Sequence, residues 1–263
     1  MRCSLGLYRH RALIWSFVKR DLLARYKGSA IGLFWAVIHP LVMLGLYTFV
    51  FSSILKVRVG AEEGTEHFAL YLLCGLLPWN AFADAITRSS GIVVEHSNLI
   101  KRVIFPSEIL PVYPVIVGIV NELIGFSLLF IALLVSGHPI GPVILALPAI
   151  LVLQFVLTTG LAWLVAGTTV FIRDLGQILG LILTLGIFLT PIFYTSSLVP
   201  QGLRPLLNAN PMFLLVEAYR SLILRGQFPA WGSMAMLALF ALVVNWLGYR
   251  VFVRMQPAFA DVL

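Results

Sequence analysis

The chain has 263 residues, of which 60% are hydrophobic and 11% charged, and its formal net charge is +7. Soluble domains carry about 25% charged residues, so this composition excludes an ordinary water-exposed surface. It predicts a single all-α integral membrane domain over residues 1–263, in which the basic excess reflects topology and not binding of nucleic acid.

The first 30 residues are basic but lack the compact apolar stretch and small-residue cleavage site of a signal peptide. Within them, residues 12–27 predict an amphipathic helix lying along the cytoplasmic membrane interface. Its apolar arc comprises Ile14, Trp15, Val18, Leu22 and Tyr26. Arg11 and Arg25 interrupt this arc, so an ordinary basic flank of the first span is the alternative.

Six continuously apolar stretches are long enough to span a bilayer, at about 20 residues each. They cover residues 31–55, 68–88, 109–135, 143–171, 175–195 and 231–252. Because the apolar runs do not alternate with period two, we expect helices and not a β-barrel.

The Lys and Arg residues divide unevenly between the two sides of these spans. Thirteen of the 18 fall on the side that holds both termini, and five fall on the other. The positive-inside rule therefore places both termini in the cytoplasm.

The cytoplasmic loop at 89–108 carries apolar side chains that need a partner or lipid to bury them. A second unusual segment, 191–225, is rich in proline and broken into pieces too short to cross a bilayer. Such pieces predict re-entrant helices of an outer gate, because exposed backbone at that depth is tolerated only within protein or beside a cavity. Interfacial helices that stabilise the rim are the alternative.

No phosphate-binding loop occurs, because no glycine is followed directly by lysine. The residues show no catalytic set, and Cys3 and Cys74 provide no metal-ligand spacing, so free thiols are expected. We therefore predict no catalytic residue, no metal and no cofactor in this chain, and any ATP must be hydrolysed by another polypeptide.

Glu122 lies near the middle of the third predicted span. A carboxylate at that depth predicts an ion path or a polar seam, although a packing residue satisfied by partners is the alternative.

Several aromatic residues could line a passage for sugars, which stack on aromatic faces. The candidates for a channel or gate lining are Trp35, Trp79, Phe82, Phe188, Phe193 and Tyr194. Membrane-interface belts or simple packing are the alternatives for each of them.

A series of short motifs resembles the ABC-2 permeases that export O-antigen, capsule and teichoic acid. In chain order they are Arg25-Tyr26-Lys27-Gly28-Ser29, Gly75-Leu76-Leu77-Pro78-Trp79, Asn98 to Glu108 (NLIKRVIFPSE), Arg173-Asp174, Pro191-Ile192-Phe193-Tyr194 and Asn210-Pro211. Each motif alone is weak, but their order and topology are specific.

The resemblance implies a homodimer docked on two copies of a separate ABC ATPase, which binds ATP and Mg. It implies that residues 95–105 form the helix that couples to the ATPase, with contacts from Leu99, Ile100, Lys101, Arg102 and Phe105. It also implies an interface helix at 12–27 and outer gate helices at 191–225.

A polysaccharide on an undecaprenyl diphosphate carrier is the implied substrate, of O-antigen type. Arg20, Arg25 and Lys27 are the cations nearest to the cytoplasmic interface, and we expect them to bind the diphosphate. The open alternatives are an ABC-2 exporter of a drug or small lipid, an ion-driven stand-alone transporter, and a membrane enzyme of glycan assembly.

Overall fold

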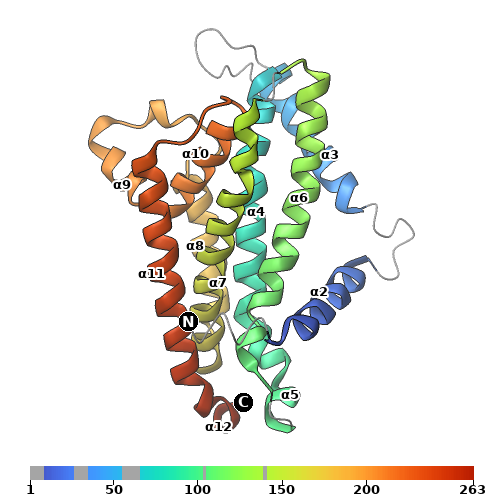
Figure 1. The fold of residues 1–263 in the computed structure, drawn as a ribbon, viewed down its shortest axis with the longest axis vertical. Helices are drawn as coiled ribbons and strands as arrows, with labels where there is room; N and C mark the ends of the chain where they lie inside the picture. The colour runs from blue at the N-terminus through green and yellow to red at the C-terminus, as the bar shows by residue number, and fades with distance from the viewer. Residues whose placement is uncertain (1–8, 27–34, 55–65, 103–104, 139–140) are drawn as a thin grey trace.

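The computed structural model describes residues 9–26, 35–54, 66–102, 105–138 and 141–263, and all regular elements among them are helical. Four long helices run side by side along the molecule (Figure 1): α4 (Glu66–Glu95), α6 (Val112–Val135), α7 (Leu147–Phe171) and α11 (Trp231–Met255). With adjoining turns these segments are 28 to 32 residues long and apolar enough to cross a membrane. The all-α prediction is therefore confirmed for the described residues.

Two shorter apolar helices accompany the bundle. α3 (Trp35–Tyr47) continues into the π-helical segment η2 (Thr48–Ile54), and α8 (Leu175–Leu189) follows α7. Each of the six stretches predicted as spans overlaps one of these six helical segments, although residues 31–34 and 55 of the first stretch lie outside the described residues.

The remaining elements are shorter than the four long helices, and most lie toward the two ends of the bundle (Figure 1). They are α2 (Arg11–Tyr26), α5 (Ser97–Arg102), η3 (Ser107–Ile109), η4 (Pro142–Ala146), η5 (Ser196–Leu198), η6 (Gln201–Leu203), α9 (Arg204–Asn208), α10 (Pro211–Ile223), η7 (Gln256–Ala258) and α12 (Phe259–Val262). One end carries α5 and α12, and we name it the α5 end. The other carries α9 and α10, and we name it the α10 end.

Two predicted boundaries differ from the structure. α4 continues to Glu95, beyond the predicted 88, because Ile92 and Val93 are buried and hold the extra turns against the bundle. α8 stops at Leu189, before the predicted 195. Thr190 adopts an extended backbone, which is the conformation favoured for a residue that precedes proline.

α7 and α11 approach each other more closely than ordinary side chains would allow. Gly160 and Gly248 face each other across this contact, where a Cβ on either would meet the backbone of the other helix. Nearby, Asn245 donates from Nδ2 to the carbonyl of Val156 at 2.8 Å. Small residues permit such packing between membrane helices, which associate through van der Waals contact and hydrogen bonds.

Candidate functional site

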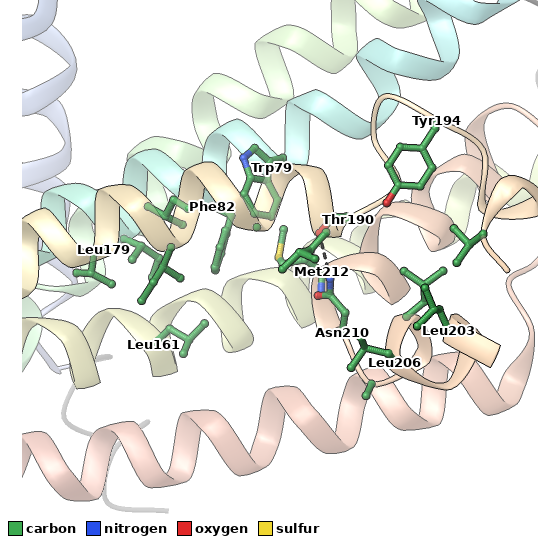
Figure 2. A pocket seen from close by; sticks show the side chains of 18 of the residues that line it. Trp79, Phe82, Leu161, Leu179, Thr190, Tyr194, Leu203, Leu206, Asn210 and Met212 are labelled. Atoms are coloured by element: carbon green, nitrogen blue, oxygen red, sulfur yellow. Dashed lines mark hydrogen bonds between the residues drawn. The ribbon is translucent and has the colours of Figure 1, made fainter. Parts of the chain in front are cut away.

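A cavity of about 580 Å³ lies between α4, α7, α8 and the segment that leads into α10 (Figure 2). Its walls are mostly apolar, with Trp79 and Phe82 from α4, Leu161 from α7 and Leu179 from α8. Its lining residues on α8 extend from Leu179 to Leu189, which at about 1.5 Å per residue corresponds to roughly 15 Å of helix. The cavity is therefore elongated along the bundle and has the size of a ligand site.

Three of the six aromatic candidates line this cavity. Trp79 and Phe82 have ring centroids 5.7 Å apart, and Tyr194 lies near the far end (Figure 2). The other three are placed elsewhere: Phe188 is 60% exposed with its ring 5.7 Å from that of Phe193, and Trp35 is exposed on α3. The predicted aromatic lining is thus only partly assembled in this chain.

Glycine brings α8 against α4 at the middle of the cavity. A Cβ on Gly186 would lie 2.8 Å from the indole ring of Trp79, whereas a Cβ on Gly180, earlier in α8, would meet nothing within 4 Å. The indole therefore packs directly on the α8 backbone.

Polar contacts in the cavity wall join the end of α8 to the start of α10 (Figure 2). Asn210 donates from Nδ2 to the Thr190 hydroxyl at 3.1 Å, and its side-chain oxygen caps α10 by accepting from the Met212 amide at 3.0 Å. Pro211 follows as the first residue of α10, a position where its missing amide proton costs no helical bond. The Asn210-Pro211 motif thus both starts α10 and ties it to the end of α8.

Within the 191–225 segment the two helices differ in burial. α10 packs most of its side chains into the bundle, whereas α9 has none that is fully buried. Sequence reasoning missed Arg220, which is fully buried in α10 and donates to the carbonyls of Pro191 and Ile192. The Glu217-to-Arg220 spacing within an amphipathic helix was the available signal, although it does not identify these backbone partners.

Glu122 lies in the interior of the bundle and is 2% exposed. It accepts a hydrogen bond from Gln154 Nε2 at 2.7 Å, and Gln154 Oε1 accepts one from the Tyr219 hydroxyl at 2.6 Å. These contacts join α6, α7 and α10, and Glu122 does not line the cavity. Glu122 thus lies in a polar seam between three helices.

At the α5 end, Phe17 of α2 joins four segments of the chain. Its ring stacks on Tyr113 of α6 with centroids 5.3 Å apart, and it meets the rings of His96 and Phe105 edge-on at 5.7 and 6.1 Å. The face of α2 that packs on the bundle therefore contains Ile14, Phe17 and Val18, while Trp15, predicted on that face, is 60% exposed.

An ion pair and a hydrogen bond hold α2 in the same place. Arg88 of α4 forms an ion pair with Asp21, and Arg20 donates to His96 Nε2 at 3.3 Å. Of the predicted diphosphate ligands, Arg20 is exposed, the side chain of Arg25 is not described, and Lys27 lies outside the described residues.

The predicted ATPase contacts divide into two groups. Leu99, Ile100 and Phe105 are partly buried against the chain's own apolar cluster at the α5 end. Lys101 is exposed, as are Glu95 and Asn98, and the side chain of Arg102 is not described. In this chain the exposed face of α5 and of the turn before it is thus polar.

The chain is similar to known proteins over nearly its whole length. The family model described as "ABC-2 type transporter" matches residues 12–224. An O-antigen export system permease protein, RfbA, of Myxococcus xanthus is 28% identical over 99% of both chains. RfbA of Klebsiella pneumoniae is 26% identical over 93% of this chain and 92% of its own length, and the polysialic acid transport protein KpsM of Escherichia coli is 22% identical over 91% and 92%.

Proposed function

The chain belongs to the ABC-2 type transporter family, and from this premise we propose that it exports a lipid-linked polysaccharide of O-antigen type across the bacterial inner membrane. As a multi-pass permease of this family it has no catalytic domain or cofactor of its own, and it works with a separate ATPase subunit. The observation that carries the substrate class is the end-to-end similarity to permeases of O-antigen export.

The proposed assembly is a homodimer on two ATPase copies, with six spans per chain and both termini in the cytoplasm. In this orientation the α5 end faces the cytoplasm and the α10 end faces the periplasm. The passage runs along the dimer axis, with Trp79, Phe82, Phe188, Phe193 and Tyr194 offering aromatic faces to the sugars. The 191–225 segment is the outer gate, and ATP biases it because ATP binds the two gate states with different affinities.

We place the ATPase contact on the exposed side of the 95–105 segment, at Glu95, Asn98 and Lys101. Arg102 stays a predicted contact from the sequence. Leu99, Ile100 and Phe105, which pack on the chain's own core, hold this segment in position. An Ile100→Asp substitution would therefore disturb both the docking and the fold.

Asn98→Trp is the sharper test, because Asn98 is exposed and a bulky side chain there blocks docking without entering the core. We expect the native chain to co-purify with its ABC ATPase and Asn98→Trp to lose the partner. Asn208→Trp, at an exposed asparagine of the α10 end, is the matched control and should retain it.

If Asn98→Trp co-purified with the ATPase as well as the native chain does, the docking site would lie elsewhere. If the native chain bound no ATPase, and export survived deletion of every candidate ATPase, the ion-driven alternative would replace this proposal. A drug or small-lipid exporter would instead leave surface glycan intact when the chain is deleted.

For the carrier diphosphate we propose Arg20, Arg25 and Lys27, because cations bind phosphate oxygens through charge-assisted hydrogen bonds. Each such bond contributes about 1.5–3 kcal/mol, or at least about tenfold in affinity. Replacing all three by glutamine should abolish export, measured as surface glycan, while the ATPase still co-purifies. Lys19→Gln on the same helix, where Lys19 is also exposed, is the control, and normal export by the triple variant would refute the assignment.

A further inference from the structure

Arg220 is an arginine with 0% exposure inside a bundle of apolar helices. Nη1 donates to the Pro191 carbonyl at 2.6 Å and to Glu217 Oε1 at 3.3 Å, while Nη2 donates to the Ile192 carbonyl at 3.1 Å. Its guanidinium also lies 3.6 Å from the centre of the Tyr71 ring. A buried cation is costly unless its partners replace water, so this set of contacts fixes where the side chain can lie.

The socket for this guanidinium is formed by a glycine of α4. A Cβ on Gly75 would lie 2.8 Å from Arg220 Nη2 and 3.3 Å from a methyl carbon of Val216. Because Gly75 lies one helical turn after Tyr71, the ring and the missing side chain together form the floor under Arg220. This gives a physical reason for the glycine that begins Gly75-Leu76-Leu77-Pro78-Trp79.

The two carbonyls that Arg220 binds belong to the segment directly after α8. α8 has no fully buried side chain of its own, so its position depends on its few contacts with α4 and α7 and on the links at its end. Those links are the Thr190–Asn210 hydrogen bond and the bonds from Arg220. Both lead to α10.

We infer that Arg220 is a positioning residue, a latch that fastens the end of α8 to α10 and to the Tyr71–Gly75 socket of α4. The end of α8 and α10 then move together. This inference rests on the proposed function in one respect: the body fastened by the latch is the proposed outer gate.

The latch can open without leaving a bare charge. Glu217 accepts from Arg220 and also from Arg225 Nη2, the latter at 3.0 Å. If the two carbonyl bonds break, Arg220 keeps its carboxylate partner and its ring contact. The segment at 190–192 can therefore separate from α10 with the charge of Arg220 still paired, at the cost of the two carbonyl hydrogen bonds.

Backbone hydrogen exchange on the purified full-length chain tests the latch without ATPase or glycan. In Arg220→Met we expect amides of residues 190–199 to exchange at least tenfold faster, while those in the middle of α4 and α7 stay at the native rate. Arg225→Gln, which removes an exposed arginine bonded to the same Glu217, is the matched control and should change little. Unchanged exchange at 190–199, or an equal rise throughout the bundle, would overturn the latch.

Gly75→Ala provides an independent second variant. In the native background it should accelerate exchange of 190–199, because the added methyl displaces the guanidinium. In the Arg220→Met background it should add nothing, and additive effects would contradict the socket.

A solely structural arginine would affect ATPase activity and export together. A latch predicts that Arg220→Met loses export while the complex keeps its ATPase activity, and that Arg220→Lys, which keeps the charge, recovers part of the export. Loss of both activities in proportion would overturn the positioning role. Failure to find an ATPase or glycan partner would refute the proposed function and leave the exchange result standing.

Discussion

Gly248→Ala is expected to separate α11 from α7 and to destabilise the chain by on the order of 3 kcal/mol, the upper part of the range for overpacking. The added methyl would overlap the backbone carbonyl of Gly160, and a backbone atom cannot rotate away as a side chain can. The opposite side of the contact is equally tight, since a Cβ on Gly160 would lie 2.5 Å from the Cα of Asn245. The midpoint of thermal unfolding in detergent measures this loss.

Gly232→Ala is the matched control for this substitution. Gly232 lies in the same helix, but a Cβ there would meet nothing within 4 Å, and alanine is the better helix former by about 1 kcal/mol. Its midpoint should equal or exceed that of the native chain. Equal midpoints for the two variants would show that α7 and α11 do not depend on the glycine contact.

The helices were predictable from sequence because long apolar runs leave few alternatives in a bilayer. Their rotation was not, because a helix that is apolar all round gives no sign of which face it buries. The result is visible among the aromatic candidates, where Trp79 and Phe82 line the cavity and Phe188 faces outward. The end of α8 at Leu189 could have been predicted, because Pro191 favours an extended backbone at the residue before it, Thr190.

Arg220 shows the limit of local reasoning at the candidate site. By sequence it counted as one charge on the outer side of the membrane, and its spacing from Glu217 did not identify its backbone partners. Its environment comes from Tyr71, Gly75, Pro191 and Ile192, which only the tertiary fold brings together. The apolar face of α2 was easier to predict from sequence, since Ile14, Phe17 and Val18 have the spacing of one helix face.

Phe17→Ala is expected to release α2 from the bundle and to abolish export. Removing a buried phenylalanine costs about 3–5 kcal/mol, and Phe17 is 7% exposed with three aromatic neighbours and the Arg20 guanidinium 4.7 Å above its ring. The loss falls where α2 meets α6 and the turn before α5, because Phe17 contacts Tyr113 and His96 there, whereas the Arg88–Asp21 ion pair links α2 to α4. Faster hydrogen exchange over residues 11–26 is the measurement.

Trp15→Ala is the matched control, because it removes a larger aromatic ring from the same helix at a site that is 60% exposed. It should leave exchange of α2 at the native rate, and equal protection in both variants would contradict the central place of Phe17. The consequence for transport follows from what Phe17 connects: Arg20 lies on its own helix, and His96 directly precedes α5. If the proposed ATPase contact acts on the proposed diphosphate site through this ring, Phe17→Ala should retain the ATPase partner and lose export. Loss of the partner as well would show that the ring only holds the docking segment in place.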